Sequence, residues 1–186
     1  MSAIEIAGAI ITVVSIWLAT RENLWYYPTG IASVLLYAWI YAHARLYAEA
    51  GLQLVWLGLM VYGWWAWLRG GENRRELPVS RTPRRSWPLV LGAAILMSVI
   101  TTLLQRRYTN NPAPLIDSSI AGFSIVAQAM TARKWIENWL FWIVINVVSI
   151  YLYLRRELYP TAALYVVLLI LGVAGYRKWQ KSLASA

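Results

Sequence analysis

The sequence predicts an all-α polytopic membrane protein, and three observations support this class. Hydrophobic residues fill 60% of the 186 positions and charged residues only 13%, about half the charged share of a typical soluble domain. A soluble domain of this composition would expose large apolar surfaces to water. Seven apolar runs are each long enough to cross a bilayer, and most charged residues lie between them.

The seven expected membrane spans cover most of the chain. Pro28, Pro88 and Pro160 stand near the starts of their spans, where a missing N–H group is tolerated best. The first span does not resemble a cleavable signal peptide, because no basic residue precedes it and Glu5 lies within it. The spans are expected at residues 3–20, 28–48, 50–69, 87–105, 115–132, 137–154 and 159–177.

The distribution of Lys and Arg predicts an N-terminus outside and a C-terminus in the cytoplasm. In this orientation 12 basic residues lie on the inner side and 5 on the outer side, as the positive-inside rule expects. The cytoplasmic basic linker, residues 70–86, carries the largest share and could also contact anionic lipid. Topology therefore explains the net charge of +9, and nucleic-acid binding is not expected.

Two parts of the chain resemble each other. Residues 46–67 and 158–179 are identical at 10 of 22 positions without a gap, including the Gly63/Gly175 and Trp67/Trp179 pairs. Upstream, the pair Glu22-Asn23 aligns with Glu137-Asn138 if one residue is then inserted before the next matches. The sequence thus predicts that one three-helix unit occurs twice.

The predicted organisation is 3+1+3 helices. Residues 1–69 form the first repeat and residues 115–179 the second, with the linker 70–86 and a connecting helix, 87–105, between them. Because a single helix separates the repeats, both face the same way across the membrane, as in parallel-repeat transporters that rock around a midplane site. A duplicated scaffold without a transport role is the alternative.

A line of amides and indoles follows the span 137–154. Asn138, Trp142 and Asn146 recur at helical spacing, with Trp139 on the flank. Polar side chains inside a bilayer normally face the bundle interior or a cavity, where indole faces attract cations and amides form hydrogen bonds. These residues predict a site for a flat polar cation. The alternatives are an interfacial anchor for Trp139 and interhelical hydrogen bonds for Trp142 and Asn146.

Other spans offer similar side chains at helical spacing. Amides occur at Gln53 and Gln128, and Tyr37 could meet a hydroxyl group of a ligand, although simple packing is the alternative for this residue. The predicted substrate-binding residues are Tyr37, Gln53, Trp56, Ser124, Gln128, Asn138, Trp139, Trp142 and Asn146.

Several residue types are missing where other functions need them. The chain has no cysteine and a single histidine, His43, and its carboxylates are scattered near the ends of the spans, so no metal site, cofactor or catalytic residue is predicted. No charged residue lies near the middle of a span, which favours passive diffusion over proton coupling. No glycine-rich nucleotide-binding motif is present either.

The stretch "RKWIENWLFWIVINVVS" and the "YGWWAW" end of the third span resemble the PnuC-type bacterial vitamin transporter family. The resemblance implies a full-length SWEET-like fold, usually a homotrimer, in the bacterial inner membrane. It also implies facilitated diffusion of an unphosphorylated vitamin that a cytoplasmic kinase then traps. Nicotinamide riboside is the family's founding substrate, and thiamine is the alternative. Two other classes remain as alternatives: the substrate-binding subunit of an energised transporter, and an integral membrane enzyme.

Overall fold

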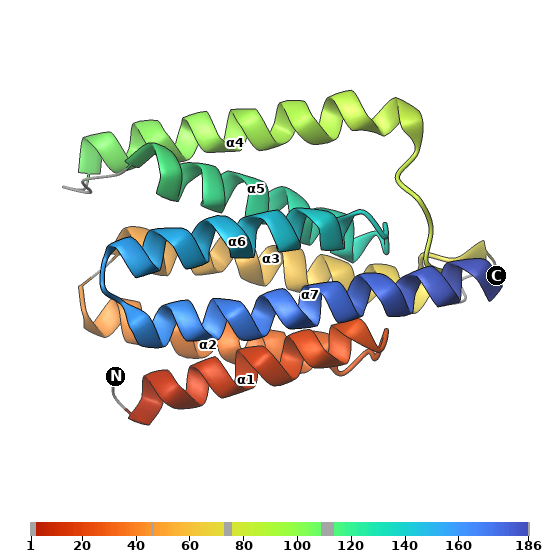
Figure 1. Ribbon diagram of the computed structural model, residues 1–186, viewed down its shortest axis with the longest axis horizontal. Helices are drawn as coiled ribbons and strands as arrows, with labels where there is room; N and C mark the ends of the chain where they lie inside the picture. The colour runs from red at the N-terminus through yellow and green to blue at the C-terminus, as the bar shows by residue number, and fades with distance from the viewer. Residues whose placement is uncertain (1–2, 46, 73–75, 109–113, 186) are drawn as a thin grey trace.

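A computed structural model describes residues 3–45, 47–72, 76–108 and 114–185. The described residues form seven α-helices and one short 3-10 helix, η2, which joins directly onto α4 (Figure 1). Their bounds are α1 Ala3–Thr20, α2 Tyr26–His43, α3 Tyr47–Arg69, η2 Arg84–Ser86, α4 Trp87–Tyr108, α5 Pro114–Ala132, α6 Asn138–Arg155 and α7 Tyr159–Ser185. The predicted all-α class is confirmed, with one helix at each predicted span.

The largest differences from the predicted spans are at helix ends. Helix α2 ends at His43 instead of residue 48, because the backbone turns at Arg45 with a φ of 61°. Helix α7 continues to Ser185, well beyond the predicted end of its span at residue 177. This last part is rich in Lys and polar residues, and the span prediction followed only the apolar residues.

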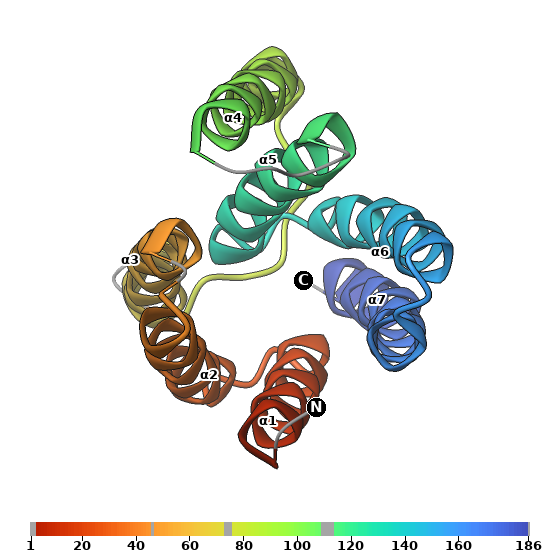
Figure 2. The same ribbon diagram turned by 90° about the vertical axis from the view of Figure 1, so that its left-hand side faces the viewer.

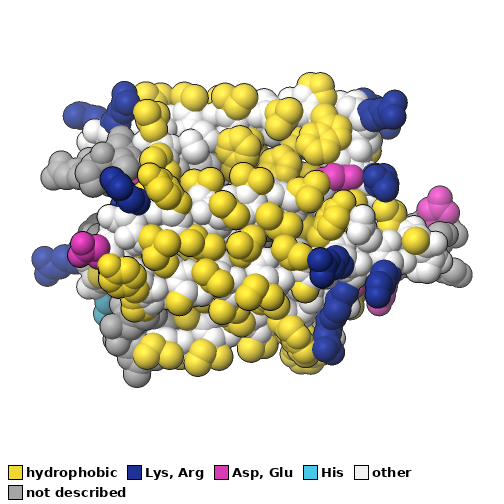
Figure 3. All heavy atoms as spheres, viewed as in Figure 1, with side chains coloured by type: hydrophobic (Ala, Val, Ile, Leu, Met, Phe, Trp, Pro, Cys, Tyr) yellow, Lys and Arg dark blue, Asp and Glu magenta, His cyan; other side chains and the backbone are white. Residues whose placement is uncertain are grey.

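The outside of the bundle is apolar, as expected for a protein surrounded by lipid. Within the described residues, four helical segments are long and apolar enough to cross a membrane: Arg84–Arg107, Leu115–Ala132, Asn138–Arg155 and Tyr159–Ser185. A shorter apolar helix covers Ile6–Thr20. In Figure 3 the hydrophobic side chains form a broad band, and the basic side chains gather at its two ends. Helices α2 and α3 carry many tyrosine, tryptophan, alanine and glycine residues.

Six of the helices are arranged around a common centre, and α4 stands outside them (Figure 2). Neighbours in sequence pack together within α1–α2–α3 and within α5–α6–α7. The two groups meet through α1 against α7 and through α3 against α5, whereas α4 packs mainly against α5. The centre of the molecule is therefore enclosed by two groups of three helices.

One end of the bundle holds most of the buried aromatic side chains. We call it the basic end; it comprises the turns at 20–26 and 132–138, the described parts of the α3–α4 connection at 69–72 and 76–87, and the end of α7 at 177–185. Tyr26, Tyr27, Trp67, Trp139 and Trp179 belong to one buried cluster there, and each is at most 2% exposed. The Trp67 and Trp179 rings lie 5.9 Å apart between centroids, and Trp139 meets Trp179 edge to face at 5.4 Å.

The connection between α3 and α4 packs against the bundle. Ser80 pairs with the α5–α6 turn by donating its N–H to the Lys134 carbonyl at 3.0 Å and accepting from the Ile136 N–H at 2.9 Å. The Thr82 N–H and hydroxyl both donate to Glu137, at 2.8 and 2.7 Å. The linker was predicted as a topology signal, and its described part also fastens the α5–α6 turn.

Corresponding features of the two groups are separated by one constant step in residue number. Helix α6 has the bounds of α2 moved along the chain by a fixed number of positions, and α7 begins after α3 by the same number. This number is 112, the separation of Glu22 and Lys134, and we call it the common offset. Residues related by it are called corresponding residues.

The residues with positive φ obey the same relation. Glu22 at 55° corresponds to Lys134 at 50°, and Arg45 at 61° corresponds to Glu157 at 58°. The predicted pairing of Glu22 with Glu137, and the insertion that accompanied it, are therefore replaced by a gap-free relation.

Candidate functional site

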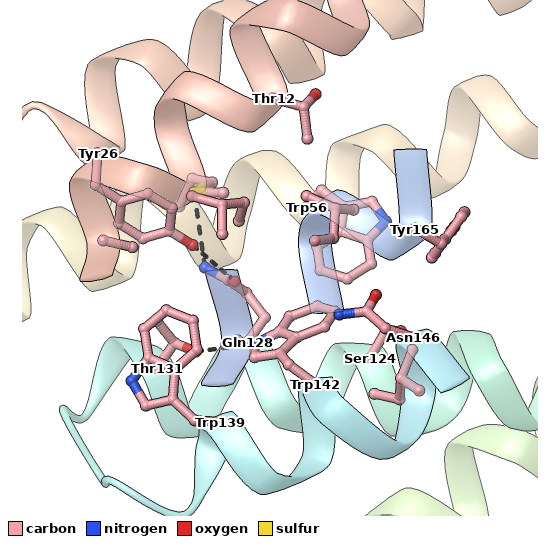
Figure 4. A pocket seen from close by; sticks show the side chains of 16 residues that line it. Thr12, Tyr26, Trp56, Ser124, Gln128, Thr131, Trp139, Trp142, Asn146 and Tyr165 are labelled. Carbon is pink, nitrogen blue, oxygen red and sulfur yellow. Dashed lines mark hydrogen bonds between the residues drawn. The ribbon is translucent and has the colours of Figure 1, made fainter. Parts of the chain in front are cut away.

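A cavity of about 240 Å³ lies at the centre of the six helices. Its described lining comes from α1, α2, α3, α5, α6 and α7, so both groups of three helices contribute to it. The lining residues are Thr12, Ile16, Ala19, Tyr26, Trp56, Met60, Ser124, Gln128, Thr131, Trp139, Trp142, Ile145, Asn146, Tyr165, Leu168 and Gly172. Figure 4 shows the polar and aromatic members of this set from close by.

Aromatic rings surround much of the cavity. Trp139 and Trp142 are on α6, Trp56 on α3, Tyr26 on α2 and Tyr165 on α7. Two of the rings are held by their neighbours: Trp139 packs against Gly175 and Trp179, and Tyr165 stacks on Tyr153 with 5.2 Å between centroids. Ring faces of this kind attract flat and cationic ligands.

Gln128 is fixed in the cavity by residues of the other helix group. The Tyr26 hydroxyl donates to its Oε1 at 2.9 Å, and its Nε2 donates to the Met60 Sδ at 3.6 Å (Figure 4). Gln128 is only 2% exposed, and a buried amide without partners would be costly. These contacts therefore orient the amide and join α5 to α2 and α3.

Thr131 connects two of the residues predicted for the site. Its hydroxyl lies 2.9 Å from the Ala127 carbonyl and 3.0 Å from the Asn138 Oδ1, and it donates to one of them. The same oxygen accepts from the Trp142 indole N–H at 3.3 Å. The Asn138 Nδ2 donates to the Trp135 carbonyl at 2.6 Å. Thr131 and Asn138 thus help to hold Trp142 in place.

Six of the nine predicted site residues line the cavity: Trp56, Ser124, Gln128, Trp139, Trp142 and Asn146. Three others lie outside its described lining. Asn138 is fully buried, and its amide is hydrogen-bonded to Thr131 and Trp135. Tyr37 faces α1, packing against Gly8 and stacking on Tyr41 at 6.0 Å. Gln53 is half-buried on α3, one helical turn before Trp56.

The sequence analysis missed four polar or aromatic members of the lining: Thr12, Tyr26, Thr131 and Tyr165. Tyr26 was placed before its span, which was expected to begin at residue 28. Tyr165 had a signal that was not used, because the gap-free alignment of 46–67 with 158–179 pairs it with Gln53. No comparable signal marked Thr12 or Thr131.

The lining can bind but offers little for catalysis. No Asp, Glu, Lys, Arg or His is among the described residues that form it. Among the described positions, no group of three or more His, Cys, Asp or Glu residues lies close enough together to hold a metal ion. Rings, amides and hydroxyl groups suit a flat polar molecule, which the rings contact face-on while the amides meet its polar edge.

Comparison with known proteins identifies the family. A family model described as "Nicotinamide mononucleotide transporter" matches residues 2–181. The chain belongs to this family. It is 30% identical, over 207 aligned positions, to the nicotinamide riboside transporter PnuC of Escherichia coli (strain K12), an alignment that covers 98% of this chain and 87% of that protein.

Two further members of the comparison show the range of the family. The chain is 28% identical to the riboflavin/roseoflavin transporter RibM of Streptomyces davaonensis, with 94% of this chain and 83% of that protein covered. In three dimensions it is similar to the crystal structure of the vitamin B3 transporter PnuC, with a TM-score of 0.75 and 25% sequence identity. The match covers 96% of this chain and 80% of that chain. The predicted resemblance to PnuC-type proteins is confirmed, and this family member is a multi-pass membrane protein.

Proposed function

We propose that this PnuC-family chain takes up an unphosphorylated vitamin and that nicotinamide riboside is its first candidate substrate. The observation that carries the proposal is the cavity between the two helix groups, with its rings, amides and hydroxyls. Nicotinamide riboside is a flat pyridinium cation with a carboxamide and a ribose. Trp142 and Trp139 offer ring faces to the pyridinium, and Asn146 and Ser124 offer hydrogen bonds to the carboxamide and the ribose hydroxyls.

The charge of the lining favours the riboside over its phosphorylated form. A phosphate monoester carries about −1.5 to −2 charges at pH 7 and would have to leave water for this cavity. Without a basic residue among the described lining residues, the desolvation of that charge is not compensated. The nicotinamide mononucleotide named in the family description is therefore a weaker candidate for this chain than the riboside.

Two other vitamins are alternatives. Thiamine, the alternative that the sequence left open, carries a thiazolium cation that suits the same rings. Riboflavin is favoured by the similarity to RibM. The cavity volume of about 240 Å³ lies below the range of about 300–1,000 Å³ that holds drug-sized ligands. This size favours a ligand with one or two small rings over the three fused rings of a flavin.

We further propose that α1–α3 and α5–α7 are two copies of one unit, in the 3+1+3 arrangement of a full-length SWEET-like fold. The common offset of helix bounds and turns supports this proposal. The repeats would be residues 1–69 and 115–179, with the linker 70–86 and the connecting helix 87–105 between them. Rocking of one unit against the other would then expose the cavity to each side in turn.

The proposed setting is the inner membrane of a bacterium, with the N-terminus outside and the basic end in the cytoplasm. The excess of Lys and Arg at the basic end supports this orientation, and several exposed arginines there can contact anionic lipid. A homotrimer, carried over from the family resemblance, is part of the same proposal.

Transport is proposed to be passive, with a cytoplasmic kinase keeping the vitamin inside. The purified chain in liposomes should equilibrate labelled nicotinamide riboside without ATP and without a proton gradient. Uptake that needs ATP and further subunits would indicate the binding subunit of an energised transporter. Conversion of the riboside to a product by the purified chain would indicate a membrane enzyme.

A further inference from the structure

The cavity is closed toward the basic end by residues that also form its lining. Ala19 and Thr131 line the cavity near the C-terminal ends of α1 and α5. Below them lies the buried aromatic cluster with Tyr27, Trp67 and Trp179. A molecule leaving the cavity through the basic end would have to pass Ala19 and Thr131 and then the aromatic cluster.

Two indole hydrogen bonds hold the helix groups together at this closure. The Trp67 Nε1 on α3 donates to the Thr131 carbonyl on α5 at 3.0 Å. The Trp179 Nε1 on α7 donates to the Ala19 carbonyl on α1 at 3.1 Å. The two donors are corresponding residues, and so are the two acceptors, so the second bond repeats the first with the two groups exchanged.

An ion pair also joins the groups. The Lys134 Nζ lies 3.2 Å from the Glu22 Oε2, with side-chain exposures of 6% for Lys134 and 24% for Glu22. The same ammonium group lies 4.6 Å from the centre of the Trp67 ring. Because Lys134 is almost fully buried, loss of Glu22 would leave its charge without a carboxylate partner in a poorly solvated place.

Glu22 and Lys134 occupy corresponding positions in the two groups. Each follows its helix, α1 or α5, in the left-handed conformation, with φ of 55° and 50°, which non-glycine residues adopt rarely. If the two groups carried the same residue here, like charges would face each other across the centre. The opposite charges make attractive a contact that exact repetition would make repulsive.

The closed arrangement also has an internal cost. Among the described residues, the buried Tyr27 hydroxyl and Trp139 Nε1 have no hydrogen-bond partner. These two are again corresponding residues, and each ring packs against a glycine of its own group, Gly63 or Gly175. Unpaired buried donors destabilise the state that contains them, so the closure combines three stabilising links with two opposing terms.

We propose that the Glu22–Lys134 ion pair is the latch of a gate at the basic end, formed when the cavity is closed there and broken when the units move apart. The inference rests on the proposed transport function, because only a transporter needs to open this end. In this proposal the ion pair sets the equilibrium between the closed and open states and does not contact the vitamin.

The test uses the natural absence of cysteine from the chain. Ile16, on the cavity wall, is replaced by cysteine, and a membrane-impermeant sulfonated maleimide is added to inside-out vesicles without substrate. Glu22→Lys and Lys134→Glu should each raise the labelling rate about tenfold, because a shift of this size in the open population follows from losing a partly buried ion pair. The exchanged pair E22K/K134E should return the labelling rate toward that of the Ile16→Cys protein with Glu22 and Lys134 intact.

The exchanged pair also shows whether the single variants merely unfold, since it carries both changes. The control is the ion pair between Arg156 and Asp117, which lies at the other end and within one helix group, at 2.8 Å. Asp117→Arg should leave labelling from the basic end unchanged. The proposal would be overturned if the single reversals left the labelling rate unchanged. It would also be overturned if the exchanged pair were labelled as fast as either single variant.

Labelling is measured without substrate, so it is separate from the test of vitamin binding. If the protein binds no vitamin but shows the expected labelling pattern, the gate proposal stands and the proposed substrate is wrong. If the protein transports the vitamin but all variants are labelled equally, only the role proposed for the Glu22–Lys134 ion pair is wrong. Because the two reversals change the local charge in opposite directions, a rise in both also excludes attraction or repulsion of the anionic reagent.

Discussion

The two helix groups place different chemistry around the same cavity. At corresponding positions, Ile16 of α1 stands opposite Gln128 of α5, and Ala19 stands opposite Thr131. All four line the cavity, but the first group contributes methyl groups where the second contributes an amide and a hydroxyl. The helix bounds and turns recur at the common offset, whereas the hydrogen-bonding residues are concentrated in the second group.

The large side chains also differ between the groups. On α2, Gly30 packs against Met60 of α3; at the corresponding positions, Trp142 is on α6 and Gly172 on α7, both in the cavity lining. The bulky residue has thus moved from the third helix of one group to the second helix of the other. Trp142 therefore has no counterpart among the ring-bearing lining residues of the first group, whose indole in the cavity, Trp56, corresponds to Leu168. Groups with the same helix bounds can thus support an asymmetric site.

The strongest expected effect comes from removing that indole. Trp142→Ala should weaken binding of nicotinamide riboside by about 10- to 100-fold, because a stacked aromatic or cation–π contact contributes about 1–3 kcal/mol. Calorimetric titration in detergent measures the change. Trp65→Ala is the matched control, since Trp65 is 56% exposed on the outside of α3, and it should bind like the unaltered protein. Equal losses in both variants would contradict the asymmetric site.

A second substitution makes the two groups alike at one position. Gln128→Ile, which copies Ile16, removes an amide from the cavity lining and should weaken binding about tenfold. It also leaves the Tyr26 hydroxyl without its acceptor, which should lower the free energy of unfolding by about 1–3 kcal/mol, the cost of an unpaired buried polar group. Adding Tyr26→Phe should recover the stability lost through the unpaired hydroxyl, as measured by thermal unfolding. The same titration applies, and a double variant whose losses simply add would show that the two side chains act independently.

Two corresponding glycines provide a matched pair with different outcomes. A Cβ at Gly175 would lie 2.6 Å from the Trp139 ring, and one at Gly63 would lie 2.6 Å from the Tyr27 ring. Each Gly→Ala variant should lower the unfolding free energy by about 1–3 kcal/mol through overpacking. Only Gly175→Ala should also weaken vitamin binding, several-fold, because Trp139 lines the cavity and Tyr27 does not.

Thermal unfolding and titration of both glycine variants separate these effects. Gly58→Ala serves as the control, since an added Cβ there meets no atom within 4 Å. Loss of binding in Gly63→Ala without loss of stability would show that Tyr27 contributes to the site.

The smallest expected effect concerns the orientation of Trp142. Thr131→Val removes the hydroxyl that accepts from the indole and should weaken binding about threefold, in line with a net contribution of about 0.5–1.5 kcal/mol for one hydrogen bond. Thr131→Ser keeps the hydroxyl and should restore most of the affinity. A serine variant as weak as valine would indicate that the methyl group, rather than the hydrogen bond, positions the ring.

The sequence was sufficient to predict the helices because length and hydropathy dominate in a membrane protein. It was also sufficient for most of the α6 stripe, since residues three and four apart share a helix face. It could not give the rotation of α2 about its axis, which turns Tyr37 toward Gly8 and Tyr26 toward Gln128. That rotation depends on packing between helices, which no local pattern encodes.

The pairing of distant residues was equally out of reach. Glu22 and Lys134 lie far apart in the chain, and the Glu22–Glu137 alignment favoured by sequence identity led away from their correspondence. The helix turns recur at the common offset even where the side chains differ in charge. Backbone geometry therefore revealed a relation that residue identity concealed.

The central claim is that an uncharged, aromatic cavity binds an unphosphorylated vitamin. Calorimetric titration of the purified protein with nicotinamide riboside, and then with nicotinamide mononucleotide, tests it most directly. The account predicts saturable heat with the riboside and none with the mononucleotide, because the cavity offers no basic side chain to the phosphate among its described residues. Binding of the mononucleotide as tight as that of the riboside, or no binding of the riboside, would contradict it.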